Sequence, residues 1–219
     1  MRRTVGLVHA VQPSIPPLRE AFAAHLPDVR VLHLLDEALL AEVERLGGVR
    51  PSLVRRLTTL IALLEQAQAE VVLLACTAYS GVVDQVRAQC EVPVLPIDAV
   101  LVGEAVQRGP RLGVLGTVEA GVRVQESLLR AEAERRGIPL DIRLVIRPEA
   151  FAALNAGDGA RHDTIVLEEA QRLAPQVDAL VLAQASMARL VPQFPADLAV
   201  PVLASPTLAV AKVREVMRL

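Results

Sequence analysis

An internal repeat constrains the fold of this chain more than any other feature. Three short segments recur along the sequence: VGLV at 5–8 and LGVL at 112–115, VLLAC at 72–76 and LVLAQ at 180–184, and VPVL at 92–95 and again at 200–203. The offset is 107 residues for the first pair and 108 for the other two. Three matched segments at almost the same spacing predict two halves of similar structure.

Within each half, strand-like segments alternate with helix-like segments. Short apolar runs rich in Val, Leu and Ile are typical of buried strands, and longer amphipathic stretches indicate helices between them. This alternation predicts an α/β fold with parallel sheets and right-handed crossovers. We expect two pseudo-symmetric, flavodoxin-like lobes with an active-site cleft between them. Residues 1–98 and 206–219 are expected to form the first lobe, and residues 99–205 the second.

The apolar runs place the individual strands. We expect strands at 4–9, 29–34, 71–75, 92–95, 112–117, 140–146, 177–183 and 200–203. Helices are expected in the intervening stretches, including 81–90, and the last one should open at Ser205-Pro206. This final helix has no counterpart in the repeat, so we expect it to return to the first lobe.

The segment EVVLLACTAYSG at residues 70–81 places a cysteine at the end of a predicted strand. Residues 71–75 form the apolar run, and Cys76-Thr77 follows it. Ligands bind at this end of the strands in open α/β sheets. The amino end of a following helix would favour the thiolate, the form of Cys76 that removes protons or attacks carbon.

The second half carries a different residue at the equivalent strand end. Gln184 stands where the repeat places the partner of Cys76, and Ala185-Ser186 follows it. An amide can form hydrogen bonds, but it cannot carry a proton to or from carbon near neutral pH. A mechanism that needs an acid on one face of the substrate and a base on the other therefore lacks its second thiol.

These features resemble the aspartate/glutamate racemase superfamily, whose relatives include hydantoin racemases, maleate isomerases and arylmalonate decarboxylases. The resemblance covers nearly the whole chain. It implies two pseudo-symmetric lobes, no cofactor, and a cysteine, usually followed by Thr, at equivalent strand ends of each lobe. In members of that superfamily, one thiolate takes a proton from the carbon next to a carboxylate, and the other thiol delivers one to the opposite face.

The resemblance carries over residue by residue only in part. Cys76-Thr77 matches the Cys-Thr element of the first lobe, and Thr117 matches the hydroxyl residue that ends the first strand of the second lobe. Residues 184–186 occupy the place of the second Cys-Thr element and depart from it. The loop at residues 9–14, HAVQPS, also departs, because racemases tend to carry glycine-rich or acidic loops there.

The candidate site follows from the strand ends and from this match. The expected catalytic residues are Cys76 and His9, the latter because neutral imidazole is a competent base near pH 7. The expected substrate-binding residues are Ser14, Thr77, Ala78, Thr117, Gln184, Ala185 and Ser186. We expect no metal and no cofactor.

Three functions remain open from the sequence. The first is a racemase-like enzyme that transfers a proton at the carbon alpha to a carboxylate, with Cys76 as its single active-site cysteine. The second is a one-thiol decarboxylase of malonate-type acids, in which the cysteine protonates the carbanion. The third is a non-catalytic protein that binds a small carboxylate.

The composition of the chain limits the classes of molecule that we expect it to bind. With 23 basic and 25 acidic residues and 2% aromatics, the chain gives no reason to expect nucleic acid as a partner. No apolar stretch is long enough to predict a membrane span. Two cysteines without a secretory signal predict a cytoplasmic protein with reduced thiols. The expected partner is a small carboxylate or amino-acid substrate, with a homodimer possible.

Overall fold

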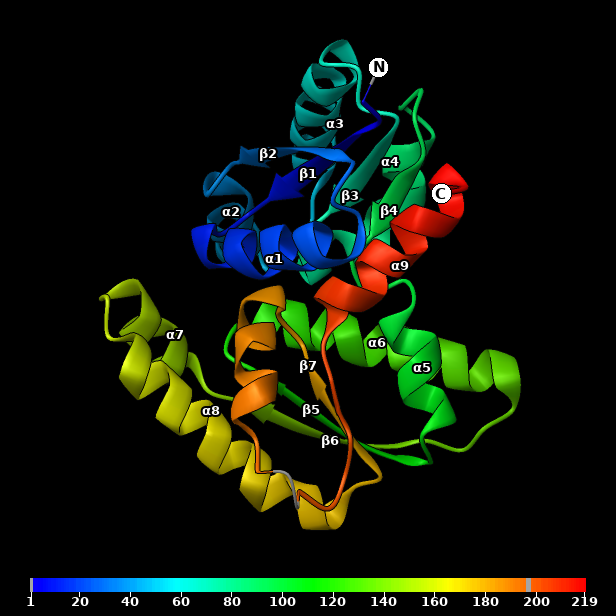
Figure 1. Cartoon of the computed structure of the whole chain (residues 1–219). Coiled ribbons are helices and arrows are strands. Elements are labelled where there is room, and N and C mark those ends of the chain that lie inside the picture. The colour runs from blue at the N-terminus through cyan, green and yellow to red at the C-terminus, as the bar shows by residue number, and fades with distance from the viewer. Residues whose placement is uncertain (1, 196–197) are drawn as a thin grey trace. The chain divides into compact units, whose positions relative to one another are not determined.

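The computed structural model describes residues 2–195 and 198–219 (Figure 1). The chain divides into two compact units. Unit 1 comprises Met1–Val100 and Pro206–Leu219, and unit 2 comprises Leu101–Ser205. Each unit holds a four-stranded sheet in which every pairing between neighbouring strands is parallel. The predicted α/β fold with two similar halves is confirmed.

The sheet of unit 1 has the strand order β2-β1-β3-β4. Its strands are β1 (Thr4–His9), β2 (Arg30–Leu35), β3 (Val71–Leu74) and β4 (Val94–Pro96). Its helices are α1 (Ile15–His25), α2 (Ala38–Leu46), α3 (Pro51–Gln66), α4 (Val83–Arg87) and α9 (Ser205–Met217), and its short 3-10 segments are η1 (Gln12–Ser14) and η2 (Thr77–Val82). The final helix, red in Figure 1, is held in this unit by Arg3 and Arg214, whose guanidinium groups donate to the carbonyls of Met217 and His25.

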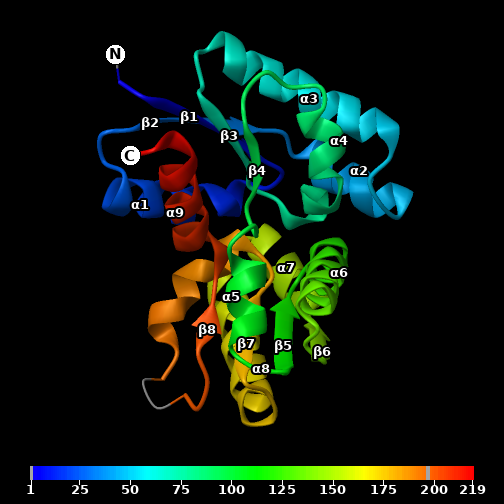
Figure 2. The same cartoon turned by 90° about the vertical axis from the view of Figure 1, so that its right-hand side faces the viewer.

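The sheet of unit 2 repeats this topology with the order β6-β5-β7-β8, and its four strands are labelled in Figure 2. Its strands are β5 (Arg111–Gly116), β6 (Asp141–Ile146), β7 (Ala179–Leu182) and β8 (Val202–Leu203). Its helices are α5 (Leu101–Gln107), α6 (Glu119–Arg136), α7 (Pro148–Asn155) and α8 (Gly159–Leu173), with 3-10 segments η3 (Ala174–Gln176) and η4 (Ala185–Gln193). None of the helices in the described parts of the chain is long and apolar enough to cross a membrane.

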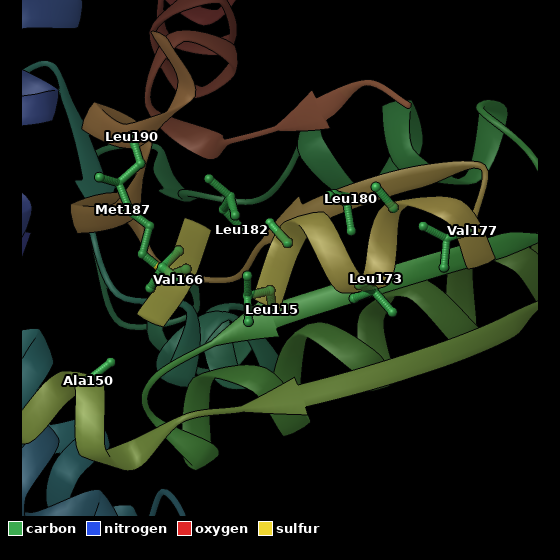
Figure 3. Packing of buried hydrophobic residues seen from close by; sticks show 11 residues of the cluster. Leu115, Ala150, Val166, Leu173, Val177, Leu180, Leu182, Met187 and Leu190 are labelled. Atoms are coloured by element: carbon green, nitrogen blue, oxygen red, sulfur yellow. The ribbon is translucent and has the colours of Figure 1, made fainter. Parts of the chain in front are cut away.

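The two central strands of each sheet form the core. Every residue of β1, β3 and β7 is buried, as are all residues of β5 except Arg111. Figure 3 shows how Leu115 of β5 and Leu180 and Leu182 of β7 pack with Val166 and other apolar residues of α8. Strands buried on both faces need the near-continuous apolar runs that the sequence contains at these positions.

Matched glycines allow a helix to approach the first strand of each sheet. A Cβ atom added at Gly6 would lie 2.7 Å from Cδ1 of Leu64 on α3, and one added at Gly113 would lie 2.6 Å from Cδ2 of Leu173 on α8. Such distances are shorter than van der Waals contact, so any larger residue would force the leucine to move. The G shared by VGLV and LGVL is therefore a packing requirement of both units.

The segment after β3 differs from the helix expected at residues 81–90. It begins as the six-residue 3-10 turn η2, and α4 follows with only five residues. The N–H of Tyr79 donates to the carbonyl of Cys76 at 3.1 Å, which is the i+3 pattern of a 3-10 turn. The Tyr79 hydroxyl donates to the Leu39 carbonyl at 2.9 Å, which fixes the ring under the turn.

Candidate active site

Cys76 lies two residues after the last residue of β3, a central strand that pairs with β1 on one side and β4 on the other. Its backbone is still extended, with φ −142° and ψ 113°, and the η2 turn begins at the next residue. Thr77 and Ala78 lie on this turn and are buried, whereas Cys76 itself is half-buried. The sequence thus places Cys76, Thr77 and Ala78 together at one strand end, where ligands bind in such sheets.

The Cys76 thiol is held in its protonated form. Its pKa is raised to about 11, mainly by burial and to a smaller extent by the nearby Asp98 carboxylate, while a hydrogen bond from the N–H of Ala78 opposes the shift. The prediction that a helix N-terminus would favour the thiolate is wrong for this structure. A short 3-10 turn offers few free N–H groups, and its effect is smaller than the cost of a charged sulfur in a buried environment.

Asp98 is a site residue that sequence reasoning missed. It lies between β4, which ends at Pro96, and α5, which begins at Leu101. The Asp98 carboxyl is 1% exposed, and burial raises its pKa to about 6, while the hydroxyls of Ser80 and Thr77 oppose that shift. An acid at the end of the strand next to Cys76 was the signal available in the sequence.

Gln184 follows β7 with a backbone close to that of Cys76, φ −137° and ψ 136°. Its side-chain oxygen accepts from the backbone N–H of Thr117 at 2.5 Å and from the Thr117 hydroxyl at 2.9 Å. A backbone N–H can only donate, so the atom that receives it must be the amide oxygen. The orientation of the amide is therefore fixed, and its NH₂ group is left as a pair of donors.

The remaining candidates of unit 2 lie next to this amide. Ala185 and Ser186 open η4 immediately after Gln184, and both are buried. The N–H of Met187 donates to the Gln184 carbonyl at 3.1 Å, as in the turn after Cys76. The structure thus groups Thr117, Gln184, Ala185 and Ser186 at one edge of the second sheet.

His9 lies at the end of β1 and is completely buried. Its Nδ1 lies 2.6 Å from the Ser14 hydroxyl, and its Nε2 lies 2.9 Å from Nδ1 of His33 on β2. The Ser14 hydroxyl donates to the Val11 carbonyl at 2.8 Å, so Ser14 accepts the proton of His9 Nδ1. His9 Nε2 then accepts from His33. The hydrogen-bond chain occupies both ring nitrogens of His9 within unit 1.

This environment keeps the imidazole of His9 neutral. Its pKa is lowered to about 3, mainly by burial and also by the neighbouring His33. The pKa of His33 is also lowered, by burial and by Arg19. The catalytic role of His9 stays a prediction, and its bonds to Ser14 and His33 give it a competing structural role. Over residues 2–195 and 198–219, no group of three or more His, Cys, Asp or Glu side chains is arranged to hold a metal.

Solved structures of amino-acid and allantoin racemases have the same fold. An allantoin racemase from Klebsiella pneumoniae is 18% identical with a TM-score of 0.72, over 99% of this chain and 88% of that one. A glutamate racemase from Francisella tularensis subsp. tularensis SCHU S4 is 13% identical with a TM-score of 0.74, over 99% and 81%. An aspartate racemase homologue from Pyrococcus horikoshii OT3 is 16% identical with a TM-score of 0.69, over 100% of both chains.

Sequence comparison agrees with this likeness of fold. A search of curated proteins finds no match. The family model described as Asp/Glu/Hydantoin racemase, in contrast, matches residues 15–213. The match covers most of both units, including the Cys76 and Gln184 strand ends. The chain belongs to the Asp/Glu/hydantoin racemase family and is an enzyme of the racemase/isomerase type.

Proposed function

We propose that this protein is a cofactor-independent enzyme that transfers a proton at the carbon alpha to a carboxylate, with Cys76 as its single acid/base thiol. The observation that carries the proposal is the contrast between two equivalent strand ends. One ends in a half-buried cysteine, and the other ends in a glutamine whose amide is fixed by Thr117. The first can exchange a proton with carbon, and the second can only donate hydrogen bonds.

In this proposal the glutamine has a binding role. The NH₂ group of Gln184 donates to a carboxylate oxygen of the substrate, and Thr117 keeps the amide from rotating. The Ser186 hydroxyl and the η4 backbone add donors on the same strand end, and Thr77 and Ala78 do so beside the thiol. Preorganised N–H donors stabilise the negative charge that develops on carboxylate oxygens when the alpha carbon becomes a carbanion.

The chemistry of Cys76 favours proton donation as its first step. A thiol with a pKa of about 11 is protonated at neutral pH, so it enters a reaction as an acid. This supports decarboxylation of a malonate-type acid as the second candidate. There, the bond to the leaving carboxylate breaks, carbon dioxide departs, and its electron pair stays on the alpha carbon. Cys76 then gives that carbon its proton, and solvent protonates the thiolate again.

His9 enters the proposal through Ser14. As the direct partner of Cys76 it would have to leave its hydrogen bond with His33 or Ser14 before it could accept a proton. We propose instead that it holds the loop at residues 9–14 in place, so that Ser14 keeps its position at the start of α1. A substrate contact by Ser14 would then depend on an intact His9.

Hydrogen exchange tests the proposed function. The protein is incubated in heavy water with aspartate, glutamate and α-substituted malonates, and products are read by NMR and chiral chromatography. Exchange at the alpha carbon with inversion supports a racemase, and release of carbon dioxide supports the decarboxylase. Both should be lost in Cys76→Ser. A carboxylate that binds without exchange or carbon dioxide release would contradict catalysis and leave the binding protein.

A further inference from the structure

One carboxyl group and two hydroxyl groups lie at the turn that follows Cys76. Asp98 lies two residues after the end of β4, the strand paired with β3. Thr77 and Ser80 lie on η2. All three are buried. Oδ2 of Asp98 and Oγ of Ser80 are completely buried and make no hydrogen bond within the described chain. A carboxylate buried in this way is costly, so its retention beside the thiol calls for an explanation.

The repeat supplies an internal comparison for this cluster. At the offset of 108 residues that relates Cys76 to Gln184, Thr77 corresponds to Ala185, Ser80 to Ala188 and Asp98 to Pro206. The backbone of the two turns is alike, but no member of the cluster is present in the second half. The acid and the hydroxyls therefore accompany the thiol, and support of the turn alone does not require them.

We propose that Asp98 is a positioning residue for Cys76: its buried carboxylate, flanked by Ser80 and Thr77, holds a negative charge beside the sulfur and so presents Cys76 to the substrate as a protonated acid. The inference rests on the proposed function in one respect, because the acid is useful only if Cys76 donates a proton. It does not require that Asp98 contact the substrate.

The charges around the thiol are consistent with this role. With a pKa of about 6, Asp98 is ionised at neutral pH, and its charge adds to the larger effect of burial in raising the pKa of Cys76. The other titratable group beside the sulfur is Tyr79, whose pKa is raised above its usual range by burial, so it stays neutral. Asp36, Glu42 and Arg56, from the α2 and α3 side, act on Tyr79. The N–H of Ala78 is the group that opposes Asp98.

Thiol alkylation tests the proposal without any substrate. The sequence has two cysteines, so a Cys90→Ala background leaves Cys76 as the only thiol. The rate of reaction with iodoacetamide is measured between pH 7.5 and 9.5, below the midpoint of the thiol. In Asp98→Asn the thiolate fraction should rise up to about tenfold if the pKa falls by about one unit. Because a less basic thiolate is a weaker nucleophile, the alkylation rate should rise about threefold.

Matched variants separate charge from structure. Asp98→Glu keeps the charge and should retain the parent rate. Asp98→Ser also removes the charge and should raise the rate as Asp98→Asn does, so it serves as the neutral variant if Asp98→Asn folds poorly. Asp84→Asn, the same change at an exposed acid of α4, should leave the rate unchanged. A parent rate in both folded neutral variants would overturn the proposal, as would an equal rise in Asp98→Glu. Failure of the proposed function would instead appear as absent exchange in heavy water, with the alkylation difference intact.

Discussion

The strand ends of the two units share a backbone and differ in their chemistry. In each unit the second central strand ends in an extended residue, Cys76 or Gln184, whose carbonyl accepts an i+3 hydrogen bond of 3.1 Å from Tyr79 or Met187. The strand also has equivalent neighbours in the two sheets: β3 lies between β1 and β4, and β7 lies between β5 and β8. The repeat has therefore preserved the scaffold of the site in both halves.

The side chains at these strand ends separate the two units. Unit 1 carries three titratable groups there, and unit 2 carries none at the corresponding positions. The matched pairs are His9 and Gly116, Cys76 and Gln184, and Asp98 and Pro206. A duplicated scaffold can thus divide its work, with proton chemistry in one half and fixed hydrogen-bond donors in the other. The following experiments test that division.

The largest effect is expected when each strand end is truncated in turn. Cys76→Ser should lower kcat by about 10²- to 10⁴-fold, because it removes the acid/base group. Gln184→Ala should act mainly on KM, by about tenfold, because it removes hydrogen bonds to the substrate carboxylate. Steady-state kinetics on the substrate found by exchange separate the two. Equal losses of kcat in both variants would break the comparison.

Acid should destabilise the protein through His9. Its pKa is about 3 when folded and 6.5 when unfolded, so the unfolded chain binds more protons between these values. The free energy of unfolding therefore falls as the pH drops below 6.5, by about 2.5 kcal/mol at pH ~4.5. Asp98 acts oppositely: its folded pKa of about 6 exceeds 3.8, and it adds stability as the pH falls through that range.

Urea unfolding at pH 7 and at acid pH checks this prediction. His9→Gln should remove most of the acid-induced loss, and Asp98→Asn should deepen it. His25→Gln, which replaces an exposed histidine of α1, is the control for loss of a histidine as such. The prediction fails if His9→Gln shows the same loss of stability at acid pH as the parent protein.

The matched glycines should give similar effects in both units. Gly6→Ala and Gly113→Ala each bring a methyl group into Leu64 or Leu173, so each should cost about 1–3 kcal/mol of unfolding free energy. Gly159→Ala adds a methyl group in open space at the first position of α8 and should be neutral or slightly stabilising. A large loss in only one of the first two variants would show that the units differ in packing as well as in chemistry.

The smallest effect is expected at the opposite ends of the same strands. Arg3 pairs with Glu70 in unit 1, and Arg111 pairs with Asp178 in unit 2; one partner of each pair is exposed and the other is half-buried. Exposed ion pairs are screened by water and contribute little. Arg111→Ala should therefore change the urea midpoint by an amount close to the error of the measurement, and Arg3→Ala should change it only slightly more, because Arg3 also donates to the Met217 carbonyl. A clear shift in either would mean that this end of the repeat also stabilises its sheet.

The fold was predictable from sequence because its signals are local and repeated. Apolar runs at fixed spacing specify strands buried on both faces, and the repeat with its matched glycine specifies two similar sheets. The short η2 turn was not predictable, because it depends on Tyr79 reaching the Leu39 carbonyl, 40 residues away. Helix boundaries shift whenever such a long-range bond competes with local preference.

The candidate site was predictable in place but not in charge state. The strand ends identified Cys76 and Gln184, since the position along a strand decides which residues lie at its edge. The pKa of Cys76 and the neutral state of His9 depend on how deeply each is buried and on neighbours distant in sequence. The hydrogen bond between Thr117 and Gln184 joins residues 67 apart, and no sequence motif predicts it.

That bond also limits which residues the second strand end can accept in evolution. The Thr117 N–H is part of the main chain, so no side-chain replacement at Thr117 other than proline removes it. A shorter residue at position 184, cysteine included, would leave this buried donor without its acceptor, at a cost of about 1–3 kcal/mol. A return to two thiols would therefore need a second, compensating change. A single substitution of Gln184 by cysteine would therefore restore the thiol only at a cost in stability.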